Sequence, residues 1–171
     1  SLRKSDGTRA VGTLLDRNHP GYARIMKGES YTGPAVLFGR NYMTHYEPVK
    51  EGNRITGIHF IGLDFTEGIK NLKDKIRSIR FAGNGYIFII EGNRSIERGK
   101  CVVHVSPELE GSDLSKLKDA AGMDITRIML EKQNGTMKYS WKDENSMRLN
   151  STRHSAFNYY GDWDWIIATS V

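Results

Sequence analysis

Residues 83–90 read GNGYIFII, a glycine-rich turn followed at once by aromatic and β-branched residues. Gly-Asn-Gly predicts a tight turn, and Tyr, Ile and Phe favour a strand, so a strand is expected to begin directly after the turn. A further turn at 91–93, EGN, precedes a second predicted strand at 100–105, KCVVHV. The stretch therefore predicts two neighbouring strands joined by a turn-rich segment.

A helix is predicted on the N-terminal side of these strands. Its apolar residues recur at spacings of three and four, and Thr66 is suited to cap its first turn. The periodic positions are Ile69, Leu72, Ile76 and Ile79. The glycine-rich turn at 83–85 is expected to end this helix.

The rest of the C-terminal half predicts one more helix and three more strands. Ile125 and Met129 share a helical face, and strand patterns follow at 136–141, 150–159 and 163–171. The order helix, strand, strand, helix and three strands predicts an α+β fold of the PAS-like kind. In such a fold a five-stranded antiparallel sheet is flanked by helices. Parallel βαβ repeats, as in dinucleotide-binding folds, are not indicated.

The first third of the chain predicts a short helix and a separate group of strands. The helix is expected after Pro20, with Tyr22 and Ile25 on one face. Residues 31–64 alternate as strands do, with a hairpin turn at 51–53. This group is interpreted as a partial second sheet that precedes the five-stranded one.

Composition and charge indicate a globular protein that neither binds nucleic acid nor is held by disulfides. Hydrophobic residues make up 38% and charged residues 26%, which is ordinary for a globular protein, and the net charge is only +5. The basic residues at 70–80 are interpreted as the solvated face of a helix, so no nucleic-acid partner is expected. The single cysteine, Cys101, cannot form an internal disulfide.

The C-terminal motifs resemble, in the same order, those of Cache sensor modules. Residues 83–89 resemble the GNGYxF/W strand that opens such a module. VHVSPELEG at 103–111 and DLSKLKDAAG at 113–122 resemble the segments that follow. GTMKYSW at 135–141 is similar to the GxxxYxW strand, and WDWIIATSV at 163–171 resembles the closing strand.

The N-terminal motifs resemble the end of a different Cache type that is fused ahead of the first. They are DGTRAVGT at 6–13, YTGPAVLFGRNYM at 31–43 and GIHFIGLD at 57–64. The resemblance implies a partial first Cache module at 1–65, without its usual leading helix and earlier strands. A connecting helix at 66–82 and a second, PAS-like Cache module at 83–171 complete the expected organisation.

The resemblance implies the extracytoplasmic ligand-sensing region of a bacterial methyl-accepting chemotaxis receptor. Such a region is periplasmic, belongs to an inner-membrane protein, is anchored through segments absent here, and acts as a homodimer. The expected ligand is a small molecule, with a C2–C4 carboxylate preferred. The same sensor on a histidine kinase or a cyclic-nucleotide enzyme stays open as an alternative. A ligand-free structural or dimerisation module is the other alternative.

Candidate ligand-binding residues of the second module follow from the resemblance and from strand period. Arg153 begins the segment that resembles the family's pocket-facing KxSY strand, and it is the expected cation for a carboxylate, with Arg148 as a weaker choice. Strand alternation places Tyr86 with Phe88 on one face, and Tyr139 with Trp141 on another. The further candidates are His104 and Ser155. A solvent-facing Arg153, and aromatic residues that only fill a core, stay open as alternatives.

In the first module, Arg40, Tyr42, Thr44 and Tyr46 recur at every second position of one predicted strand. A cation followed by three hydroxyl donors predicts an anion-binding row. The alternative is an exposed edge that carries two aromatic residues.

Enzymatic patterns are absent from the sequence. It contains no Gly-x-Ser-x-Gly elbow and no Walker loop, and its five histidines lack metal-ligand spacing. The chain is therefore predicted not to be an enzyme, and no cofactor or metal is expected.

Overall fold

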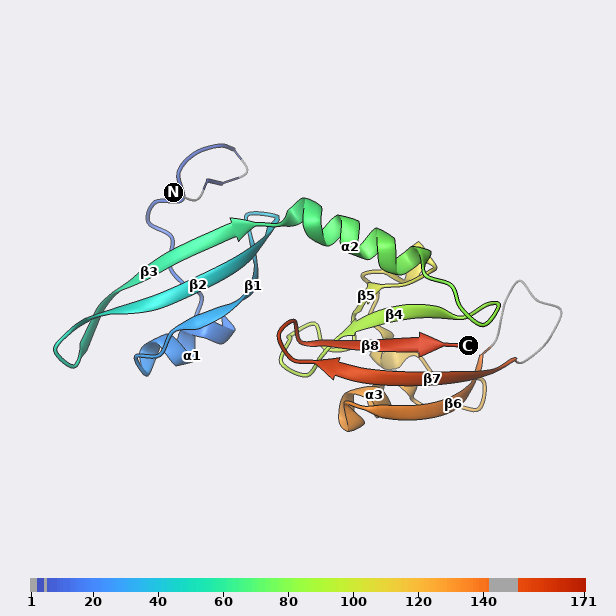
Figure 1. The fold of residues 1–171 in the computed structure, drawn as a ribbon. Helices are drawn as coiled ribbons and strands as arrows, with labels where there is room; N and C mark the ends of the chain where they lie inside the picture. Colours follow the sequence, from blue (N-terminus) through green and yellow to red (C-terminus); the bar gives the residue numbers. More distant parts are fainter. Residues whose placement is uncertain (1–2, 5, 142–150) are drawn as a thin grey trace. The chain divides into compact units, whose positions relative to one another are not determined.

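The computed structural model describes residues 3–4, 6–141 and 151–171, and the chain forms two compact units, residues 1–70 and 71–171. Figure 1 shows the elements of each unit in chain order. The helix that contains the boundary between the units is α2, Thr66–Ser78. Each unit holds one antiparallel sheet, so the predicted α+β class is confirmed.

The first unit contains a three-stranded sheet and one short helix. The helix is α1, Pro20–Met26, and the strands are β1, Tyr31–Leu37, β2, Arg40–Glu51, and β3, Arg54–Asp64. β2 lies between β1 and β3, and both pairings are antiparallel. The predicted hairpin turn at 51–53 joins β2 to β3, and His19 caps α1 by accepting a hydrogen bond from the Gly21 N–H.

The second unit contains the five-stranded sheet that the sequence predicts. Its strands are β4, Tyr86–Glu91, β5, Cys101–Val103, β6, Gly135–Trp141, β7, Ser151–Tyr160, and β8, Trp165–Ser170. They lie in the order β5-β4-β8-β7-β6, and all four pairings are antiparallel (Figure 1). The last strand, β8, therefore lies in the centre of the sheet, beside the unit's first strand, β4.

Between β5 and β6 the chain forms two 3-10 turns and a helix. They are η1, Pro107–Leu109, η2, Leu114–Lys116, and α3, Ile125–Lys132. Met129 and Leu130 of α3 are fully buried against core residues of the sheet such as Phe88 and Ile166. Burying such side chains contributes about 1.5–3 kcal/mol each, so the packing of α3 on the sheet stabilises the unit.

Two predicted elements end earlier than expected, each for a local reason. α2 ends at Ser78, and Phe81 and Gly85 then exchange two backbone hydrogen bonds that close a turn incompatible with further helix. β5 ends at Val103, because the backbone N–H of the next residue, His104, donates to the carboxylate of Glu110 at 2.9 Å.

Glu91, the last residue of β4, carries a perturbed carboxyl group. Burial raises its pKa to about 7, and the nearby charges of Asp164 and Glu97 add to the effect. The folded state therefore binds this proton more tightly than the unfolded chain does. Stability is lost as the pH rises from the unfolded pKa of 4.5 toward 7.

We predict that Glu91→Gln raises the melting temperature at pH 8 and that this gain disappears at pH 4. The substitution removes a group whose ionised form is disfavoured by burial, and at pH 4 the glutamate is neutral anyway. Calorimetric melting at pH 4, 6 and 8 measures the effect, with the exposed Glu131→Gln as control. Parallel pH profiles for wild type and Glu91→Gln would contradict the assignment.

Candidate ligand-binding site

One face of the second sheet changes from apolar to polar along its strands. Tyr86 on β4 pairs with Ser170 on β8, and the backbone hydrogen bonds between His154 and Val171 set Ser155 on β7 opposite Ser170. Tyr139 on β6 is opposite Arg153 on β7. We call these inward-facing residues the polar row: Tyr86, Tyr139, Arg153, Ser155 and Ser170.

A buried hydrogen bond joins two members of the polar row. The hydroxyl groups of Tyr139 and Ser170 are 2.8 Å apart, and Ser170 has no exposed surface. Burial raises the pKa of Tyr139 to about 12, although the Ser170 hydroxyl and the Arg153 charge act in the opposite direction. The phenol is therefore protonated at neutral pH and is available as a hydrogen-bond donor.

Ser155 contributes a buried hydroxyl that has no hydrogen-bond partner in the part of the chain that the structure describes. Its side chain lies on the same face as the core residue Phe157, because β7 alternates between buried and exposed positions. A buried hydroxyl without a partner costs free energy, so its presence calls for an explanation.

Arg153 is half-buried and shares the inward side of β7 with Ser155 and Phe157. Among the described residues, no carboxylate forms an ion pair with it. Its charge acts on the Tyr139 phenol, whose pKa it lowers. The structure thus brings together three hydroxyl groups, those of Tyr139, Ser155 and Ser170, and a guanidinium for which the described residues supply no counter-ion.

Aromatic rings lie beside the polar row. The ring of His104 is 5.1 Å from that of Tyr86 and 6.0 Å from that of Phe88, and the ring of Trp141 is 6.3 Å from that of Tyr139. Burial lowers the pKa of His104. Its Nδ1 accepts a hydrogen bond from the Ser106 N–H, so the neutral ring carries its proton on Nε2.

The candidate row of the first unit has a different environment. Tyr42, Thr44 and Tyr46 are buried, and β2 is the central strand, so the alternative of an exposed edge is wrong. The exposed Arg40 already pairs with Asp64 at 3.0 Å. The predicted cation of this row is therefore neutralised by a carboxylate of the neighbouring strand.

Buried side chains of the first unit contact one another and the backbone. Thr44 donates a hydrogen bond to the carbonyl oxygen of Gly33 at 2.8 Å. The ring of Tyr46 lies 5.1 Å from that of His19 and 5.0 Å from that of Phe60, and burial raises the pKa of its phenol. These contacts are those of a packed core.

Sequence reasoning missed Ser170, although a signal was present. The alternation of side chains along a strand places Ser170 on the same face as the buried Ile166 and Ala168. The sequence of the closing strand therefore predicts a polar residue on the inward face.

Arg148, the weaker candidate cation, lies outside the described residues. Within the described ranges no group of three or more His, Cys, Asp or Glu could hold a metal ion.

Comparisons with known proteins give one family, from a family model, and one fold, from solved structures. The family model described as the Cache 3/Cache 2 fusion domain matches residues 1–171. A Cache chemosensory domain, solved to explain carboxylic acid recognition, gives a TM-score of 0.51 at 23% identity over 61% of this chain and 71% of that chain.

In the described residues, no helix combines the length and apolarity needed to cross a membrane.

Two further solved structures share the fold over most of the chain. The extracellular domain of a putative histidine kinase gives a TM-score of 0.60 at 16% identity, over 92% of this chain and 57% of that chain. The ligand-binding domain of an amino acid chemoreceptor from Pseudomonas aeruginosa PAO1, in complex with GABA, gives 0.52 at 16% identity, over 95% of this chain and 67% of that chain. At these identities the likeness establishes the fold.

We predict that Tyr139→Phe lowers the free energy of unfolding of the second unit by about 1–3 kcal/mol, because it leaves the buried Ser170 hydroxyl without its partner. The double variant Tyr139→Phe/Ser170→Ala should recover most of the loss, since neither group is then unpaired. Chemical denaturation measures both, with the exposed Tyr160→Phe as control. If Tyr139→Phe alone were as stable as wild type, the hydrogen bond between Tyr139 and Ser170 would contribute nothing to the free energy of unfolding.

Proposed function

Because the chain belongs to the Cache 3/Cache 2 fusion domain family, we propose that it is the extracytoplasmic ligand-sensing region of a bacterial chemotaxis receptor and not an enzyme. The observation that carries the proposal is the polar row. Among residues 3–4, 6–141 and 151–171, nothing pairs with the half-buried Arg153 guanidinium or with the buried Ser155 hydroxyl beside it. Both groups can be satisfied at once by a small ligand that supplies a negative charge and hydrogen-bond acceptors.

We propose that this ligand carries a carboxylate, preferably that of a C2–C4 organic acid. Arginine presents planar N–H donors that match the two oxygens of a carboxylate, and charge-assisted hydrogen bonds of this kind are about twice as strong as neutral ones. Ser155 supplies one neutral donor that can orient such a group, and the Tyr139–Ser170 pair supplies a second, because one of its two hydroxyl protons is used within the pair. A buried carboxylate requires partners of both kinds.

The aromatic rings favour a small ligand with little apolar surface. The ring of Tyr86 in the polar row, with Phe88 and Trp141 beside the row, would pack against a short carbon chain. The likeness to a domain studied for carboxylic acid recognition supports this class. The GABA complex extends it to amino acids, which also carry a carboxylate, so both kinds of ligand belong in the test.

Signalling requires that the ligand favour one of two receptor states. Ser170 is the last residue of β8, so a ligand bound to the polar row would contact the end of the closing strand directly. We propose that this contact shifts β8 and that the membrane segments of the full receptor carry the shift inward. A periplasmic location and a homodimer are parts of the same proposal.

A histidine kinase is the second candidate for the receptor that carries this sensor. The extracellular domain of a putative histidine kinase shares the fold over 92% of this chain. The ligand site and its chemistry would be the same, and only the output domain would differ.

The test is a thermal-shift screen against C2–C4 organic acids and the common amino acids. A ligand at 100 times its dissociation constant adds about 2.7 kcal/mol of stability. We predict a hit that disappears in Arg153→Ala and survives in Arg40→Ala, because only the first variant removes the guanidinium of the polar row.

The opposite pattern, loss in Arg40→Ala alone, would move the site to the first unit and contradict the polar row. If no compound in the screen raised the melting temperature, a carboxylate ligand would be contradicted and a ligand-free structural module favoured. In that case the mutual hydrogen bond of Tyr139 and Ser170 would be the full role of those two hydroxyls.

A further inference from the structure

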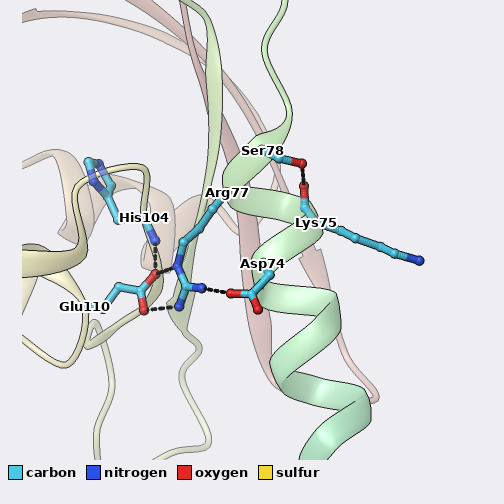
Figure 2. Close-up of polar contacts among 6 residues, drawn as sticks. All are labelled: Asp74, Lys75, Arg77, Ser78, His104 and Glu110. Carbon is cyan, nitrogen blue, oxygen red and sulfur yellow. Dashed lines mark hydrogen bonds and ion pairs between the residues drawn. The ribbon is translucent and has the colours of Figure 1, made fainter.

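The Glu110 carboxylate holds three N–H donors from two different parts of the second unit. Its Oε1 accepts from Arg77 Nε at 2.7 Å and from the backbone N–H of His104 at 2.9 Å, and its Oε2 accepts from Arg77 Nη2 at 2.6 Å. Figure 2 shows the guanidinium and the carboxylate facing each other in a fork-to-fork arrangement. Both side chains are largely buried, with 29% of Arg77 and 18% of Glu110 exposed.

The three residues come from three different parts of the chain. Arg77 lies in the last turn of α2, Glu110 follows η1, and His104 is the first residue beyond β5. Arg77 lowers the pKa of Glu110, and Glu110 in turn raises the pKa of Arg77, so both groups are charged at neutral pH. One charged carboxylate therefore ties the end of helix α2 to the end of strand β5.

His104 connects this carboxylate to the polar row. Its backbone N–H is held by Glu110, its Nδ1 is held by the Ser106 N–H, and its ring meets that of Tyr86 edge to face at 5.1 Å and 74°. With its backbone N–H and its Nδ1 both held, the ring of His104 has a defined place next to Tyr86. A displacement of Glu110 would move that ring.

We propose that Glu110 is a positioning residue for His104 and that the Arg77–Glu110 pair couples helix α2 to the polar row. The inference rests on the proposed function in that the polar row binds the ligand. Coupling between two sites is reciprocal. If moving the helix changes the free energy of ligand binding, ligand binding changes the free energy of moving the helix by the same amount. Helix α2 is then a route by which binding at the sheet reaches the segment that precedes it.

Asp74 provides a matched control on the same helix. It also pairs with the Arg77 guanidinium, through Nη1, but its side chain is 55% exposed and it has no contact with His104 (Figure 2). A substitution at Asp74 removes a charge partner of Arg77 and leaves the link to β5 in place. The proposal therefore predicts different results for Asp74 and Glu110, whereas a general salt-bridge effect predicts similar ones.

The experiment compares Arg77→Met, Glu110→Gln and Asp74→Asn in the whole chain. We expect Arg77→Met to shift the NMR signals of the His104 and Tyr86 rings in the free protein, because the carboxylate loses the partner that fixes it. Glu110→Gln should shift them less, since its amide oxygen can still accept from the His104 N–H. Asp74→Asn should leave both rings unchanged.

Calorimetric titration with pyruvate, a member of the proposed acid class, measures how each variant changes the affinity for the ligand. Arg77→Met should weaken binding about 2-fold to 30-fold, the usual range for coupling through a residue that does not touch the ligand. Asp74→Asn should bind like wild type. Ring signals that do not move in a folded Arg77→Met chain would overturn the coupling, and so would equal shifts in Arg77→Met and Asp74→Asn.

The two proposals fail in distinguishable ways. The ring signals are measured without ligand, so a wild-type chain that ignores pyruvate counts against the acid class while the coupling is still judged by NMR. If pyruvate binds wild type and Arg77→Met equally well although the rings shift, the link to the ligand is overturned and the polar-row site is retained.

Discussion

The fold and the site both depend on the pairing of β8 between β4 and β7. Ile166, Ala168 and Ser170 point to the same side of this strand, and all three have no exposed surface. The first two complete the apolar core under α3, and the third completes the polar row. A single strand thus joins the part of the unit that stabilises it to the part that presents polar groups. A ligand that bonds to the polar row acts on the strand that holds the sheet together.

Much of this architecture was predictable from local pattern. The strand and helix order of residues 83–171, the antiparallel sheet and its PAS-like character follow from turn residues, period and motif order, and the structure confirms them. The ends of elements were less predictable, because long-range partners decide them. Val103 ends β5 because Glu110, seven residues later, takes the next backbone N–H. No propensity at residues 100–105 contains that information.

The site shows the same division between local and long-range information. Alternation places Arg153, Ser155 and Phe157 on one side of β7, but only the packing of α3 decides which side is buried. In the first unit the same reasoning predicted a cation in front of three hydroxyls. There Arg40 pairs with Asp64, which is 24 residues away in sequence and adjacent only after β2 and β3 have formed. A strand's period shows which side chains share a face, while their partners come from neighbouring strands.

The central claim is that a carboxylate binds at the polar row of the second unit. A crystal structure of the chain with the acid or amino acid that most raises its melting temperature tests this claim most directly. We predict that the ligand carboxylate lies within hydrogen-bonding distance, about 3 Å, of the Arg153 guanidinium and the Ser155 hydroxyl. A ligand found against the first sheet, or one that leaves Arg153 and Ser155 without contact, would contradict the account.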